Sequence, residues 1–107
     1  MSLKDYQKQV DEAVNKYKQP YWDAVWISSQ ISEEAGEIAR EINHMYGPKK
    51  KKLTEDSTKD FGTELSDLVF AIICMANVHG INLDAAFDRT MHKIYERDKD
   101  RFEKKQS

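Results

Sequence analysis

The sequence lacks several features that mark secreted and membrane proteins. It has one cysteine among 107 residues, Cys74, so no disulfide can form within the chain, and the apolar residues around it indicate a small buried hydrophobe. The longest apolar run, residues 68–76, has nine residues, whereas a membrane-crossing helix needs roughly 18. The opening MSLKDYQKQVDEAV lacks the apolar stretch of a signal peptide. We therefore expect a cytoplasmic protein with no membrane partner.

The sequence also lacks a strong charge of one sign. Seventeen Lys and Arg residues stand against 19 Asp and Glu residues, which gives a formal net charge of −2. Broad nucleic-acid binding requires a basic surface, and the only basic run is the four lysines at 49–52. We expect no nucleic-acid polymer as a partner. The lysine run is interpreted either as a solvated loop or as a contact to phosphate that closes over a site.

No segment alternates apolar and polar residues as a β-strand does, whereas four segments repeat apolar residues every three to four positions. The pattern predicts an all-α fold: one domain over residues 1–107, an antiparallel bundle of four main helices. Its expected boundaries are Ser2 before the first helix, Pro20 in the first turn of the second, Gly47 after it, Thr54 or Ser57 before the third, Gly80 after it and Asn82 before the fourth.

The third predicted helix is apolar on every side over residues 68–76, so it must be covered all round. Three other helices, one of them short and rich in lysine, are too few to cover it. We therefore expect homo-oligomerisation to complete the bundle, with a second subunit against the remaining side of this helix.

Acidic residues three positions apart occur three times, which is about what composition alone predicts, so their context has to separate them. Asp100 and Glu103 lie among cations and indicate a solvated tail. Glu34 instead occupies an apolar stripe, and Asp67 directly precedes the apolar run. A polar residue on an apolar stripe indicates function.

The pairs Glu34/Glu37 and Glu64/Asp67 can each present two carboxylates to one point, because such neighbours lie about 5–6 Å apart on a helix. If the two helices pack face to face, all four carboxylates converge, and their repulsion favours a hard divalent cation, Mg²⁺ or Mn²⁺. Partly exposed, salt-bridged glutamates remain the alternative. A di-iron site is disfavoured, because a bundle of that kind uses two Glu-x-x-His motifs and Glu41–His44 supplies one.

These residues resemble a known family. The segment EEAGE, followed after 26 residues by ELSD, is similar to the Glu-x-x-Glu … Glu-x-x-Asp signature of the MazG-like nucleotide pyrophosphohydrolases, in the all-α NTP pyrophosphatase group. The flanking SEEAGEIAREI, ELSDLVFAIICMANVHGINLDAAF and KIYERDKDRF agree with it, so the resemblance covers about residues 22–102.

The resemblance implies a Mg²⁺-dependent hydrolase acting on a phosphoric anhydride, which splits a nucleoside triphosphate into a monophosphate and pyrophosphate. It also implies assembly as a homodimer or homotetramer. The implied metal ligands are Glu34, Glu37, Glu64 and Asp67. Glu33 and Glu37 form the implied catalytic set, with Glu33 orienting or deprotonating the attacking water.

The remaining candidates concern the substrate. Trp26 and Gln30 lie on the same side of the second helix as the carboxylates, so stacking and amide contacts to a base or sugar are one interpretation, and core or dimer contacts are the other. Asn77 is a further candidate for the base or sugar. Lys93 and Arg97 match the family's basic motif and would hold the pyrophosphate, or else form a salt-bridged surface. Many relatives carry an asparagine just before this basic pair, where the present sequence reads TMHK.

Two functional alternatives stand beside house-cleaning hydrolysis of standard or damaged nucleotides. One is a phosphoribosyl-ATP pyrophosphatase-like activity, found in another branch of the group. The other is a catalytically silent helical module that dimerises and binds a partner. The four ligand positions are all intact, which favours an enzyme.

Overall fold

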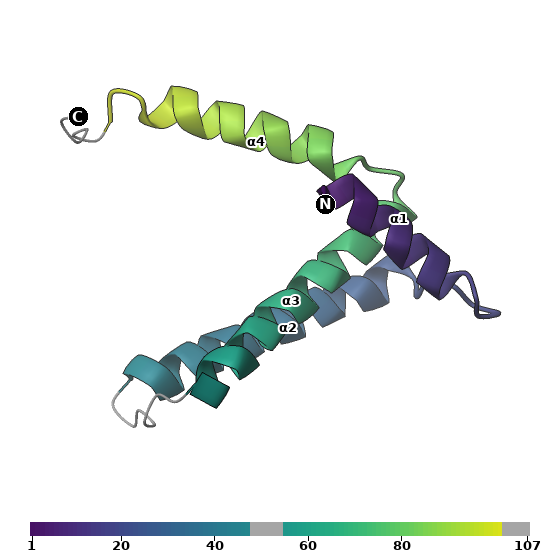
Figure 1. Ribbon diagram of the computed structural model, residues 1–107, viewed down its shortest axis with the longest axis horizontal. Helices are drawn as coiled ribbons and strands as arrows, with labels where there is room; N and C mark the ends of the chain where they lie inside the picture. Colours follow the sequence, from purple (N-terminus) through teal and green to yellow (C-terminus); the bar gives the residue numbers. More distant parts are fainter. Residues whose placement is uncertain (48–54, 102–107) are drawn as a thin grey trace.

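The computed structural model describes residues 1–47 and 55–101, and for residues 55–58 it describes the backbone alone. Within these ranges the chain forms four helices and no strand, which confirms the all-α class (Figure 1). The helices are α1 (Leu3–Val14), α2 (Ala24–Tyr46), α3 (Glu55–Val78) and α4 (Leu83–Asp98).

Several predicted helix boundaries are confirmed by local hydrogen bonds. Ser2 and Asp5 form a reciprocal capping box at the start of α1, with both bonds at 3.0 Å. Asn82 caps α4 by accepting from the Ala85 N–H. Gly80 has φ +66, a left-handed conformation that glycine adopts without steric cost, and it follows the end of α3.

One predicted boundary is wrong, and one of the two alternatives for another is excluded. Pro20 lies in a non-helical linker, residues 15–23, because α2 begins only at Ala24, where the Asp23 side chain accepts from the Trp26 N–H. Of the two positions predicted before the third helix, Ser57 lies inside α3, which begins at Glu55, the residue after Thr54. Thr54, Phe102 and the lysine run at 49–52 lie outside the described residues.

The four helices do not close into a bundle within one chain. Helices α2 and α3 form a long antiparallel pair, α1 packs against α3, and α4 points away from the pair at an open angle (Figure 1). The start of α1 is fixed to α4 by Asp84, whose carboxylate accepts the Leu3 N–H at 3.0 Å and the Lys4 N–H at 3.3 Å. These two bonds hold the start of α4 against the start of α1, and the angle between α4 and the α2–α3 pair opens from this contact.

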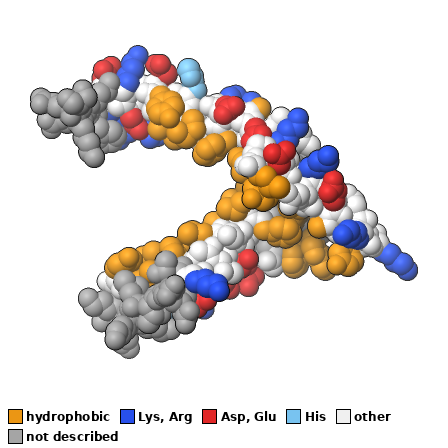
Figure 2. Space-filling view, in the orientation of Figure 1, with side chains coloured by type: hydrophobic (Ala, Val, Ile, Leu, Met, Phe, Trp, Pro, Cys, Tyr) orange, Lys and Arg blue, Asp and Glu red, His pale blue; other side chains and the backbone are white. Residues whose placement is uncertain are grey.

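The core is small for a chain of this length. Among the described residues the buried hydrophobic side chains are Ile27, Ala71, Ile73, Cys74 and Ala76. The radius of gyration is 17.6 Å, whereas a compact domain of this size has about 13 Å. Figure 2 shows hydrophobic side chains gathered along the inner side of the angle between α4 and the α2–α3 pair. The molecule thus exposes apolar surface that a compact monomer would bury.

Part of α3 is long and apolar enough to cross a membrane, with a mean hydropathy of 1.5 over Lys59–Val78. The core helix of a soluble protein has the same length and composition, and this stretch carries Glu64 and Asp67. Within α3 the buried residues are Ala71, Ile73, Cys74 and Ala76, whereas Ile72 is exposed. One such helix is weak evidence for a membrane span.

Candidate active site

Three carboxylates from two helices meet in the middle of the α2–α3 pair. One carboxylate oxygen each from Glu34, Glu37 and Glu64 lies within 4.8 Å of the other two. Glu34 and Glu37 are one turn apart on α2, and Glu64 comes from the facing helix. The predicted face-to-face packing of the two acidic segments is therefore present in the structure.

The like charges in this cluster oppose ionisation. Desolvation raises the pKa of Glu34, and the charges of Glu37, Asp67 and Glu33 raise it further. For Glu64, the hydrogen bond to the Glu37 carboxyl is the main cause of a raised pKa, followed by desolvation and the neighbouring carboxylates. The carboxylates of the site therefore repel one another, and bound protons or a bound cation would reduce this repulsion.

Two oxygens of the cluster are suited to a metal ion. Glu34 Oε2 and Glu64 Oε2 are both inaccessible to water, and neither has a hydrogen-bond partner among the described residues. Buried polar atoms of this kind need a partner, and a hard divalent cation prefers carboxylate oxygens. Asp67, the fourth predicted ligand, lies outside the 4.8 Å group, but its charge acts on both Glu34 and Glu64. The three clustered side chains fit a divalent cation.

A cavity of ≈ 310 Å³ lies beside the carboxylates. Its walls come from the linker before α2, from α2 and from α3: Trp22, Trp26, Gln30, Glu34, Asp67, Phe70, Ala71 and Cys74. The Trp22 and Trp26 rings stack with their centroids 4.6 Å apart. The predicted substrate residues Trp26 and Gln30 therefore line a space that also touches two of the predicted metal ligands.

Two other predicted residues lie differently. Glu33 is exposed on α2 and does not line the cavity, although its charge raises the pKa of Glu34. The Asn77 side chain is held within the protein, because its N–H groups donate to the Gln7 carbonyl and the Tyr21 hydroxyl, each at 3.0 Å. Its oxygen accepts from Gln7 Nε2 at 2.9 Å. These bonds favour a structural role for Asn77.

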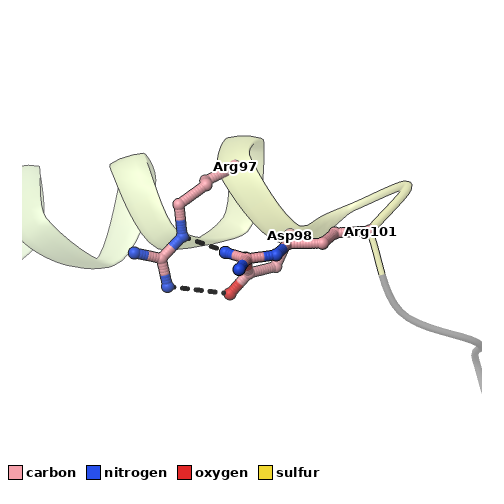
Figure 3. Close-up of polar contacts among 3 residues, drawn as sticks. All are labelled: Arg97, Asp98 and Arg101. Atoms are coloured by element: carbon pink, nitrogen blue, oxygen red, sulfur yellow. Dashed lines mark hydrogen bonds and ion pairs between the residues drawn. The ribbon is translucent and has the colours of Figure 1, made fainter.

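The predicted phosphate-binding cations lie on α4, away from the carboxylates of the same chain (Figure 1). Lys93 and Arg97 are both exposed, one turn apart. The Arg97 guanidinium makes a two-pronged contact with Asp98, at 2.9 and 3.1 Å, and Arg101 approaches the same carboxylate at 3.7 Å (Figure 3). The hydrogen bond from Arg97 lowers the pKa of Asp98. One chain alone does not place these cations at the cluster.

The Glu-x-x-His pair stays outside the carboxylate group. His44 Nδ1 lies 3.6 Å from Glu41 Oε1 on the same helix, and neither residue belongs to the cluster found among the described side chains. This arrangement gives no support to a di-iron site.

Sequence reasoning missed part of the cavity wall. Ala71 and Cys74 follow Asp67 at intervals of four and three residues, so they continue its face along α3. That spacing could have predicted them. Phe70 follows Asp67 by three residues and precedes Cys74 by four, so the same spacing could have predicted it. Trp22 precedes Trp26 by four residues, and this spacing already indicated a shared side.

Comparisons with known proteins agree with this geometry. Residues 26–102 match the MazG nucleotide pyrophosphohydrolase domain. An uncharacterized protein of Bacillus subtilis (strain 168), YpjD, is 43% identical over 105 residues, which are 98% of this chain and 94% of that protein.

Two crystal structures are similar over most of their length. A structure of YpjD from Bacillus subtilis has a TM-score of 0.78 at 42% identity, covering 87% of this chain and 94% of that one. A Bacillus-conserved MazG protein, a nucleotide pyrophosphohydrolase, has a TM-score of 0.76 at 40% identity, covering 94% and 97%. The chain belongs to the MazG nucleotide pyrophosphohydrolase family and is an enzyme of that class.

Proposed function

We propose that the protein hydrolyses nucleoside triphosphates between the α and β phosphates, with Mg²⁺ as cofactor, and releases a monophosphate and pyrophosphate. The observation that carries this proposal is the group of three carboxylates within 4.8 Å, two of which have buried oxygens without partners. A triphosphate is itself strongly negative, so this group needs a cation before it can approach one. House-cleaning of damaged or non-standard nucleotides is the proposed role.

The residues divide into three groups by position. Glu34, Glu37, Glu64 and Asp67 would hold the metal, which when bound neutralises phosphate charge and lowers the pKa of a bound water. Glu33, exposed beside Glu34 at the cluster, would orient or deprotonate the attacking water together with Glu37. Trp26 and Gln30 would hold the base and sugar, because they line the cavity that ends at Glu34.

The phosphate-binding cations enter this proposal through a second copy of the chain. Lys93 and Arg97 lie on the helix that points away from their own carboxylate cluster, and the inner side of that angle is apolar (Figures 1 and 2). A partner packed against the angle would cover the exposed α3 and α4 side chains Ile72 and Phe87, which are 40% and 54% exposed. We propose a homodimer or homotetramer in which each α4 serves a neighbour's site.

An assay of pyrophosphate release tests the chemistry. The protein is incubated with Mg²⁺ and a panel of NTPs, dNTPs and phosphoribosyl-ATP, beside Glu37→Gln and Asp67→Asn. We expect both variants to lose at least a hundredfold in rate, because each removes a charge that holds the metal. Glu12→Gln, an exposed carboxylate on α1, is the control and should keep full activity.

Each outcome of this assay has a distinct meaning. Full activity in both variants would show that the site lies elsewhere, and release of single phosphates would show that another bond is cleaved. Inactivity across the whole panel would favour the silent binding module. Preference for phosphoribosyl-ATP would assign the protein to the branch of the group that has phosphoribosyl-ATP pyrophosphatase activity.

Mixing two inactive variants tests the shared site. Glu64→Gln keeps α4 intact, and Lys93→Ala with Arg97→Ala keeps the carboxylates intact. If α4 serves a neighbour, subunit exchange between the two variants restores activity, to roughly a quarter of the wild-type value in a random dimer mixture. If each chain completes its own site, mixing restores nothing.

A further inference from the structure

Trp22 lines the cavity but lies in the non-helical linker between α1 and α2, so no helix of its own positions it. Residues 15–23 are non-helical, and Trp22 near their end stacks on Trp26 with an interplanar angle of 22°. Both tryptophans line the cavity, and so does Asp67. Because Trp22 is 58% exposed, packing alone holds it weakly, and something else must fix the linker.

The neighbouring residue, Tyr21, is tied to two helices at once. Its hydroxyl donates to the Asp11 carboxylate of α1 and accepts from Asn77 Nδ2 of α3 at 3.0 Å. Among the described linker residues 15–22, no other side chain forms a hydrogen bond to a helix, whereas the Asp23 side chain caps α2. Tyr21 is thus the point at which the linker is attached to the rest of the fold.

Asn77, the donor to the Tyr21 hydroxyl, is itself held by further hydrogen bonds. Asn77 is held by Gln7, which is 8% exposed and bonds to the turn after α3 through the Ile81 carbonyl at 2.7 Å and the Leu83 N–H at 2.9 Å. The pKa of Tyr21 is raised to about 12, mainly by burial and secondly by the hydrogen bond to Asp11. The phenol therefore stays protonated, and able to donate to Asp11, over the working range of an enzyme.

We propose that Tyr21 is a positioning residue for the nucleobase: its hydroxyl fixes the linker so that Trp22 stays against Trp26 and the pair presents one stacking wall. This inference rests on the proposed function, since it takes the cavity to be the nucleoside pocket. Aromatic rings bind the faces of bases, and a wall that is already in place costs less ordering free energy when the nucleotide binds.

The position of Trp22 also sets the size of that pocket. A second cavity of ≈ 300 Å³ shares Trp22, Phe70 and Cys74 with the first, and its remaining walls include Tyr17 and Ile27. Trp22 therefore stands between two hollows of similar volume. If the linker were released, the hollows would join, and the pocket would discriminate less against large bases.

A spectroscopic experiment tests the position of Trp22 directly, because Trp22 and Trp26 are the only two tryptophans in the chain. Near-ultraviolet circular dichroism of the full-length protein reports the stacked pair, and its tryptophan bands should weaken in Tyr21→Phe. Tyr95→Phe is the matched control, because Tyr95 is 68% exposed on α4 and no hydrogen bond from it is found in the described structure. Its tryptophan bands should equal those of the wild type.

Kinetics test whether this position matters to the substrate. Tyr21→Phe should raise KM for the best nucleotide roughly fivefold, about the effect of having to immobilise one side chain when the base binds, with kcat and the Mg²⁺ dependence unchanged. In a Trp22→Ala background the same substitution should leave KM unchanged, because Tyr21 acts through Trp22. A general loss of folding would instead lower kcat in both backgrounds.

Three results would overturn the proposal: unchanged tryptophan bands in Tyr21→Phe, a KM equal to that of the wild type, or the same increase in KM with and without Trp22. Failure of the proposed function has a separate signature. If the wild type releases no pyrophosphate from any nucleotide, the nucleobase contact is overturned with it, while weakened tryptophan bands would still support attachment of the linker by Tyr21.

Discussion

Replacing Gln7 with alanine should destabilise the protein more than any other polar substitution on α1. The side chain is 8% exposed and satisfies three groups: Asn77 Oδ1 at 2.9 Å, the Ile81 carbonyl at 2.7 Å and the Leu83 N–H at 2.9 Å. Truncation leaves all three without their partner, in a region where water enters only in part.

The magnitude follows from these three groups. A buried polar group without a partner costs about 1–3 kcal/mol, and each of these bonds is partly buried, so we take the lower end for each. Their sum is about 3 kcal/mol of unfolding free energy, which corresponds to a Tm lower by about 15 °C for a chain of this size. The loss should be large because Gln7 joins α1 to the turn that aims α4.

Urea denaturation followed by far-ultraviolet circular dichroism measures this loss, at one fixed protein concentration because association adds to apparent stability. Gln9→Ala is the matched control: Gln9 is exposed on the same helix, and its removal should cost less than about 0.5 kcal/mol. A loss below about 1 kcal/mol for Gln7→Ala would refute the reasoning, since it would mean that water replaces the lost bonds.

Three further predictions concern the site and the helix ends. The raised pKa values of Glu34 and Glu64 mean that the folded metal-free protein binds protons more readily than the unfolded chain, so its Tm should rise as pH falls from neutral toward the ordinary glutamate pKa of 4.5. Mg²⁺ should then raise Tm more at the higher pH, and an equal increase at both would contradict a carboxylate site. Asp23→Ala should cost about 1 kcal/mol by removing the cap of α2, measured by urea denaturation, whereas Asp23→Asn should be nearly neutral. Gly80→Ala should destabilise the protein by about 1 kcal/mol because φ is +66, whereas Gly62→Ala, in open space on α3, should stabilise it by about 0.5–1 kcal/mol. If both substitutions changed the unfolding free energy in the same direction, backbone conformation would not be what determines the effect.

The helices could be predicted from sequence because their signals are local. Apolar spacing places each segment, and the caps at Ser2 and Asn82 need only residues three positions away. Pro20 misled because proline suits a first helical turn as well as a linker. Only the competing cap at Asp23, with its bond to the Trp26 N–H, decides where α2 begins.

The carboxylate cluster was half predictable. The stripe position of Glu34 indicates which face it shares with Glu37, and the resemblance to a family pairs that face with Glu64. The Asn77 contacts could not be predicted, because Gln7 is 70 positions away in the sequence and Tyr21 is 56 positions away. The role of the Asn77 amide follows only from the packing of α1, the linker and α3 around it.

The direction of α4 is the feature that the sequence of one chain is least able to determine. Its apolar residues, such as Phe87 and Met91, require a covered face, but a face on the same chain and a face on a second copy satisfy that requirement equally. In the structure Phe87 is 54% exposed, and α4 leaves the α2–α3 pair at the turn held by Gln7. The same angle separates Arg97 from the carboxylates that it would serve. In the proposed assembly one partner would both bury the apolar face and complete the charge arrangement, so dilution that separates the copies should abolish activity and lower stability together.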